Sequence, residues 1–173
     1  MQGVSLLPLF GDPEVTVRRY AFSEHNWHDY EAYGRSIRDN RFLYLINRRP
    51  HLPWQGPADS VRSASHSSLR TKKEQGTLTT AQQDVFLAPR PAAEFYDVRN
   101  DPEQLHNLAG SAQYTEVEKK LAAILKQWQQ ETGDTVPQKL TPDTFDRING
   151  ESFRIGTRHG IARGETKSAD GVA

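Results

Sequence analysis

Cysteine is absent from the 173-residue chain. That absence excludes disulfides, thiolate metal sites and cysteine nucleophiles among these residues, and it leaves the redox compartment undecided. Net charge is lacking as well, because 22 Lys and Arg residues balance 22 Asp and Glu residues. A chain without net charge has no overall field that draws in nucleic acid or an anionic membrane, so we expect neither as a partner.

Long apolar runs are also missing. No stretch approaches the ~18 consecutive apolar residues of a membrane span. The N-terminal segment has no positively charged region and is a poor signal peptide. Any export signal is therefore expected outside this chain, and its localisation stays unknown. The low hydrophobic fraction of 35% predicts one compact part and one loose part.

The strongest pattern lies between residues 94 and 131. Aromatic and β-branched residues at 95–98 predict a short strand, and Asn100-Asp101-Pro102 predicts a turn. Apolar residues then recur at steps of three and four, which predicts a helix with one buried face: Tyr114, Val117, Leu121, Ile124, Leu125 and Trp128.

The ends of this helix also carry signals. Thr115 with Glu118 three residues later predicts a capping box, and Gly133 predicts the stop. Such a helix does not bury its apolar face alone, so we expect a sheet against it.

Three further strands complete the expected sheet. Residues 15–24 have the β-branched and aromatic content of a strand, and residues 34–48 predict two strands around a turn at 38–41. The predicted fold class is α+β: a small antiparallel sheet of about four strands packed against one long C-terminal helix.

Residues 50–91 interrupt this pattern with five prolines and a serine cluster, which predicts a long irregular loop with a short helix near 77–86. Its middle, residues 62–73, is basic and without acids, so it is either an anion-facing patch for a sulfated glycan or a solvated loop. Residues 135–173 have no sustained period and predict an extended or disordered tail.

Several motifs together resemble a known family. They are Phe95-Tyr96-Asp97-Val98, Asp101-Pro102-Glu103, Asn107-Leu108-Ala109, the helix ending Trp128-x-x-Glu131-Thr132-Gly133-Asp134, and the upstream segments Gly3–Phe10 and Ser36–Asn47. This set resembles the C-terminal subdomain of the alkaline-phosphatase-like sulfatases, in particular the bacterial branch similar to heparan N-sulfatase (N-sulfoglucosamine sulfohydrolase, sulfamidase).

The resemblance implies a domain organisation. Residues 1–14 correspond to the end of a catalytic domain and the junction that follows it. Residues 15–134 correspond to the C-terminal subdomain, with 50–91 as an insertion, and residues 135–173 to a tail. The apolar strip within residues 4–10 is then expected to lie against another surface.

The resemblance also implies chemistry that this chain does not carry. Sulfatases use a formylglycine made in a Cys/Ser-x-Pro-x-Arg motif and a Ca²⁺ ion held by hard oxygen ligands. The chain has no such motif, so we expect no catalytic residue, metal ligand or cofactor here and no turnover by the chain alone. Formylglycine and Ca²⁺ are expected in a catalytic sulfatase domain, in cis or as a separate chain, that acts on a sulfated carbohydrate.

Candidate substrate-binding residues cluster at 24–30. His28 and Asp29 are the nearest match to a His-acid pair that, in sulfamidase-like sulfatases, reaches over the cleft, and His25 and Glu24 are weaker candidates. Aromatic, imidazole and carboxylate groups together suit a sugar-binding edge. One alternative is a structural hairpin rim, in which Trp27 covers the sheet and the histidines bond to backbone groups. Another is a metal pair of His25 and His28 that has no evident third ligand.

Two other functions stay open. The chain could be a non-catalytic carbohydrate-binding or interaction module on the same scaffold, or a truncated gene product without activity. Fold resemblance transfers function only through the site, and most of the expected site is not in these residues.

Overall fold

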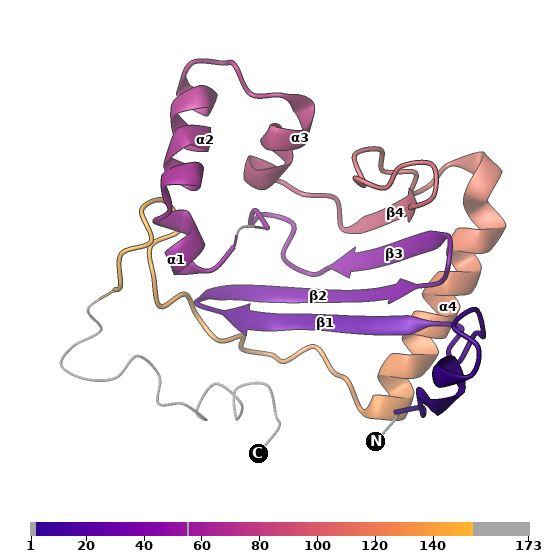
Figure 1. Cartoon of the computed structure of the whole chain (residues 1–173). Helices are drawn as coiled ribbons and strands as arrows, with labels where there is room; N and C mark the ends of the chain where they lie inside the picture. Colours follow the sequence, from indigo (N-terminus) through magenta and orange to yellow (C-terminus); the bar gives the residue numbers. More distant parts are fainter. Residues whose placement is uncertain (1–2, 55, 154–173) are drawn as a thin grey trace.

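A computed structural model describes residues 3–54 and 56–153 of the chain. Its centre is one antiparallel four-stranded sheet in the order β1-β2-β3-β4 (Figure 1). The strands are β1 (Ala21–His28), β2 (Tyr30–Arg38), β3 (Phe42–Asn47) and β4 (Ala93–Asp97). The predicted fold class and strand number are confirmed.

The first strand lies later than the residue pattern indicated. The prediction was 15–24, whereas β1 begins at Ala21, which pairs with Arg38 at the end of β2. The chain turns away after Arg38, so residues before Ala21 have no neighbouring strand to pair with. The turn itself was predicted, and Asp39 closes it because its Oδ1 accepts the backbone N–H groups of Arg41 and Phe42 at 2.8 and 2.7 Å.

Helix α4 (Thr115–Thr132) crosses one face of the sheet (Figure 1). Leu121 and Leu125, each 1% exposed, pack in one core cluster with Ile37 and Phe95, which are fully buried. At the edge of the cluster the Trp128 ring stacks on Phe22 with centroids 5.0 Å apart. The predicted apolar face of the helix and its position on strands are confirmed.

The two helix ends turned out differently. The predicted capping box is wrong, because α4 continues from the 3₁₀ turn η3 (Ala112–Tyr114) and its N-cap is Tyr114. Thr115 Oγ1 instead donates to the Ser111 carbonyl, and Glu118 accepts the Gly110 N–H. The predicted stop is confirmed, since Gly133 adopts φ 69°, a left-handed conformation that glycine takes without steric cost.

An ion pair fixes the residue after this stop to the sheet. Arg35, in the middle of β2, donates from Nε and Nη2 to the two carboxylate oxygens of Asp134 at 2.8 and 2.6 Å. Both side chains are more than 90% buried. Burial alone would raise the pKa of Asp134, but hydrogen bonds from Arg35 and Gln129 outweigh that effect, so the pKa lies below its ordinary value.

The segment between β3 and β4 is more regular than expected. It contains α1 (Ala58–Val61), α2 (Ala64–Glu74), α3 (Thr80–Gln83) and the 3₁₀ turn η2 (Asp84–Phe86). The serine cluster that predicted an irregular loop starts α2, because Ser63 is its N-cap and accepts the His66 N–H at 3.1 Å. The short helix predicted near 77–86 is confirmed.

Residues 135–153 run back along the sheet to the β1–β2 turn (Figure 1). There the Thr144 N–H donates to the Asp29 carbonyl at 2.9 Å. Phe145 packs on a second small core of Tyr30, Ala58 and Val61. The first half of the expected tail is therefore packed on the domain, and residues 154–173 lie outside the described part.

The N-terminal segment carries exposed apolar side chains. It forms the 3₁₀ turn η1 (Leu7–Phe10), in which no residue is buried. Leu7 is 72% exposed and Phe10 is 88% exposed, with Val4 and Leu6 about half exposed. These four residues form the N-terminal apolar strip (Val4, Leu6, Leu7 and Phe10), and its contact with another surface stays a prediction.

The helices offer no candidate for a membrane span: within residues 3–54 and 56–153, none is both long enough and apolar enough to cross a bilayer.

Replacing Asp134 with Ala should lower the free energy of unfolding by about 3 kcal/mol, because it leaves the buried Arg35 guanidinium without its counter-charge. Chemical denaturation of both proteins measures this difference. Glu116→Ala is the matched control, since its pair with Lys119 is exposed and should change stability little. Equal effects of the two substitutions would contradict a structural role for the buried pair.

The same pair predicts a pH dependence. The pKa of Asp134 is lowered in the folded state, so its stabilising contribution is present above the unfolded pKa of about 3.9 and is lost as the pH falls through the lower folded value. Denaturation curves between about pH 6 and pH 3 should show a smaller loss of stability on acidification in Asp134→Ala than in the unmodified chain. Identical slopes would argue against this assignment.

Candidate functional site

The sheet face opposite α4 carries a row of three paired residues, one on each of β1, β2 and β3. His25 on β1 pairs with Gly34 on β2, and Gly34 pairs with Asn47 on β3. Directly paired residues of an antiparallel sheet point to the same face. His25 and Asn47 therefore stand on one face with a position between them that has no side chain.

Trp54 fills that position. A Cβ built on Gly34 would lie 3.3 Å from Cζ2 of the Trp54 indole and 3.9 Å from the His25 Cβ. Glycine thus allows the indole to lie directly on the strand backbone. The Arg90 guanidinium lies 5.3 Å from the Trp54 ring, within the range of a cation–π contact.

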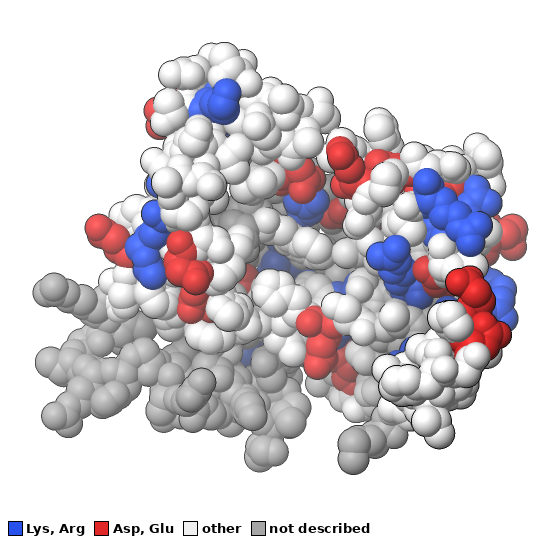
Figure 2. Space-filling view, viewed as in Figure 1, with Lys and Arg blue, Asp and Glu red and all other residues white. Residues whose placement is uncertain are grey.

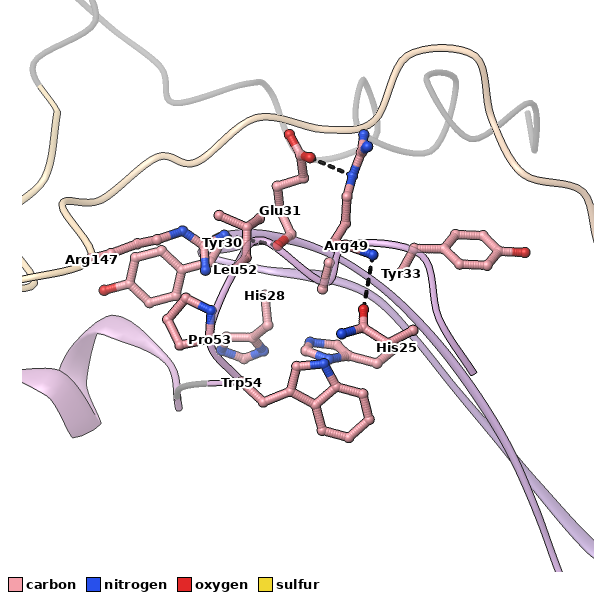
Figure 3. A pocket seen from close by; sticks show the side chains of 12 residues that line it. His25, His28, Tyr30, Glu31, Tyr33, Arg49, Leu52, Pro53, Trp54 and Arg147 are labelled. Carbon is pink, nitrogen blue, oxygen red and sulfur yellow. Dashed lines mark hydrogen bonds and ion pairs between the residues drawn. The ribbon is translucent and has the colours of Figure 1, made fainter. Parts of the chain in front are cut away.

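These side chains line a small pocket, which we call the Trp54 pocket. In Figure 3 His25 and His28 point toward Pro53 and Trp54, on one side of the strands. Glu31 and Arg49 point to the other side, where Arg49 Nε and Glu31 Oε1 form an ion pair at 2.6 Å. The space-filling view shows the surface recessed between the helices α1–α3 and the strands (Figure 2).

Asn47 contributes a buried amide to the pocket lining. Its side chain belongs to a residue that is only 3% exposed. Oδ1 accepts the Arg49 N–H at 2.9 Å. Nδ2 has no hydrogen-bond partner among the described residues.

The two histidines lie side by side in this pocket, and their proximity affects ionisation. The pKa of His25 is lowered from its ordinary value, first because the surrounding protein desolvates the ring, and then because its protonated form is repelled electrostatically by His28 and by Arg35. His25 is therefore neutral at pH 7, with one nitrogen as a donor and the other as an acceptor.

A buried polar network adjoins the pocket. Arg90 donates to Glu94 Oε1 and to Asp84 Oδ1, each at 2.8 Å. The Tyr96 hydroxyl donates to the other oxygen of Glu94, and burial together with Glu94 raises the pKa of Tyr96 well above its ordinary value. The network holds the Arg90 guanidinium in place over Trp54, since its donors are already fixed by carboxylates.

Of the four residues proposed from the sequence, two meet in the pocket. His25 and His28 line it. Asp29 lies in the β1–β2 turn with φ 64°, and its Oδ2 accepts the Ala58 N–H at 2.9 Å, so it anchors α1. Glu24 lies one residue from His25 on the opposite face, 3.8 Å from Arg35.

Sequence reasoning missed Trp54 and Asn47. One signal for Trp54 was present: Gly34 interrupts an otherwise well-formed strand, and an isolated glycine in a strand often marks the close approach of another group. Asn47 carried a weaker signal, as a polar residue that ends the apolar run of β3.

The basic segment at residues 62–73 is mostly engaged within the fold. Arg62 donates to the Gly150 carbonyl at 2.6 Å, and Arg70 donates to the carbonyls of Val61 and Ile148 at 2.9 and 3.1 Å. Lys73 lies 4.6 Å from the Phe86 ring. Figure 2 shows charges of both signs interspersed on the face in view. These contacts favour a structural role over an anion-facing patch.

No metal centre can be built from this part of the chain. Within the described residues no group of three or more His, Cys, Asp or Glu side chains could hold an ion. The Ca²⁺ ion that the resemblance implies thus finds no ligand set there, and His25 with His28 has no third ligand.

Comparisons with known proteins place the chain beside part of the bacterial sulfatases. No family model matches the chain. An ulvan-active sulfatase of Formosa agariphila is 31% identical over 136 residues, covering 78% of this chain, and another from the same organism is 26% identical over 144 residues, covering 81%. A solved 2-O GAG sulfatase aligns with 77% of this chain and 21% of its own, at 21% identity and a TM-score of 0.45.

The matched segment is a small part of each relative. It makes up 22% and 26% of the two ulvan-active sulfatases. The chain is therefore similar to a segment that makes up about a quarter of the length of two ulvan-active sulfatases.

Proposed function

We propose that this chain is the C-terminal part of a sulfatase that acts on sulfated glycans, and that it supplies support and substrate contacts to a catalytic part. The observation that carries the proposal is the 31% identity to one segment of an ulvan-active sulfatase, and the pocket lined by His25 and His28 supports it. Formylglycine and Ca²⁺ belong to the catalytic part, where they provide the nucleophile and neutralise the sulfo group.

The proposal assigns a role to each segment. Residues 1–14 join the catalytic part, residues 15–134 form the accessory subdomain, and residues 135–153 stabilise the β1–β2 turn through contacts such as that of Thr144 with Asp29. The N-terminal apolar strip is the contact with the catalytic part, because exposed Leu7 and Phe10 otherwise leave apolar surface in water. The sheet face opposite α4 then faces the substrate.

His25 and His28 are the proposed substrate contacts of this face. Both line the Trp54 pocket, and imidazoles donate hydrogen bonds to hydroxyl, sulfo or carboxylate oxygens of a sugar. Asp29 and Glu24 have structural roles in this proposal. Asp29 accepts the N–H at the start of α1, and Glu24 lies near the Arg35 guanidinium. Because the chain also resembles the heparan N-sulfatase branch, N-sulfoglucosamine is a second candidate substrate beside ulvan.

The first expected outcome concerns the chain alone. The purified chain should hydrolyse neither p-nitrophenyl sulfate nor ulvan, with or without added Ca²⁺, because it contains no Cys/Ser-x-Pro-x-Arg motif. Release of sulfate or p-nitrophenol measures this. Turnover above a heat-treated control would refute the proposed division of roles.

The second expected outcome concerns His28. In a chimera, this chain replaces the matching segment of the Formosa agariphila ulvan-active sulfatase, and His28→Ala should lower kcat/KM for ulvan about 10-fold or more by removing a hydrogen bond to the substrate. His106→Ala is the matched control, because the His106 side chain is 80% exposed and does not line the pocket. Thermal unfolding of each chimera shows that the fold is retained.

Equal kinetics of the His28→Ala and His106→Ala chimeras would return His28 to a structural role. An inactive but folded chimera, together with sugar binding by the chain alone, would favour the carbohydrate-binding module instead.

A further inference from the structure

We propose that the Trp54 pocket receives one oxygen atom of an oxyanion carried by a sugar, a carboxylate or a sulfo group, and that Asn47 Nδ2 is its hydrogen-bond donor. The inference rests on the proposed function for the sugar itself. It adds Asn47, which the resemblance did not indicate, and it specifies the chemical group that the pocket binds.

The free amide of Asn47 is the first argument. Buried side-chain donors in folded proteins nearly always have a partner. Asn47 is 3% exposed and its Nδ2 has none in the described residues. A donor in this situation marks the place of an oxygen from water or from a ligand.

The orientation of this amide is fixed by its neighbour. Oδ1 accepts the Arg49 backbone N–H at 2.9 Å. Turning the amide over would set NH₂ against that N–H, two donors facing each other. Nδ2 is therefore the atom that stays directed away from Arg49, toward the pocket it lines.

The dimensions of the pocket restrict what can enter. Its cavity volume is only about 20 Å³. One water needs about 10–15 Å³ by the same measure. A single oxygen fits, whereas a sugar ring stays outside, where Trp54, still 37% exposed, offers it an apolar edge.

The charges around the pocket favour an oxyanion. Glu31 is the single carboxylate among its described lining residues, and Arg49 pairs with it. Glu94, next to the pocket, is paired with Arg90. Asn47, His25 and His28 can each donate a hydrogen bond, and Arg147, which also lines the pocket, is a cation paired with Asp143. An acceptor with negative charge therefore suits this lining better than a cation does.

Binding by the full 173-residue chain tests the inference directly. The ¹⁵N-labelled chain is titrated with glucuronate, with glucosamine 6-sulfate and with glucose, and the side-chain N–H signals of Asn47, His25 and Trp54 are followed by NMR. We expect saturable shifts of the Asn47 NH₂ signals with one or both oxyanion sugars and none with glucose. The sugar that gives the tighter Kd identifies the source of the oxyanion.

Two isosteric substitutions provide the variant and its control. Asn47→Asp keeps the oxygen that accepts the Arg49 N–H and removes the donor, so Kd should rise about 10-fold or more. Asn107→Asp makes the same change at an amide whose Oδ1 accepts the Phe95 N–H and which does not line the pocket, so Kd should not change. Thermal unfolding is measured for both.

Each outcome decides the question. If Asn47→Asp fails to fold, the shifts of Asn47 in the unmodified chain still test the donor. Absence of saturable shifts, or equal shifts with glucose, would overturn the inference and leave Nδ2 bound to water only. If the chain shows no specific sugar binding but the chimera is active, only the pocket assignment is refuted. If the chain binds the sugar but the folded chimera is inactive, only the proposed role in a sulfatase is refuted.

Discussion

Burial of the leucines of α4 against the sheet is the interaction on which the rest of the structure depends. Leu121 and Leu125 meet Ile37 and Phe95 in the core, and the transfer of such side chains from water is the main stabilising term available to a domain of this size. A four-stranded sheet has two faces, and one helix covers only one. The helix thereby decides which face of the sheet remains for other contacts.

The ion pair between Arg35 and Asp134 couples this core to the rest of the chain. Arg35 lies on the face that α4 covers, and Asp134 follows the glycine at the helix end. The pair sets the direction in which residues 135–153 leave the helix, and these residues then reach the β1–β2 turn, where Thr144 binds the Asp29 carbonyl. The β1–β2 turn, which follows His28, is thus held by a segment whose course is set by the ion pair on the α4 face of the sheet.

The site follows from the same division of faces. His25, Gly34 and Asn47 are paired across three strands, so they point away from α4 together. Gly34 has no side chain, and Trp54 occupies the space. A pocket of this kind suits the accessory role proposed for the chain, in which it would contact a group of the substrate while the catalytic part cleaves the bond.

The sequence alone determined the elements whose signals are local. Apolar residues at helical spacing fixed α4, Gly133 fixed its end, and the Asp39 turn fixed the β2–β3 hairpin, because period and turn chemistry depend on neighbouring residues only. It also named His25 and His28 as candidates, and both line the Trp54 pocket, while their role in binding stays a prediction. Tertiary structure decided the rest: where β1 begins, how α4 is capped, and that Trp54 and Asn47, far from His25 in the chain, join it. Those outcomes depend on strand partners and on packing between distant residues, which no local pattern encodes.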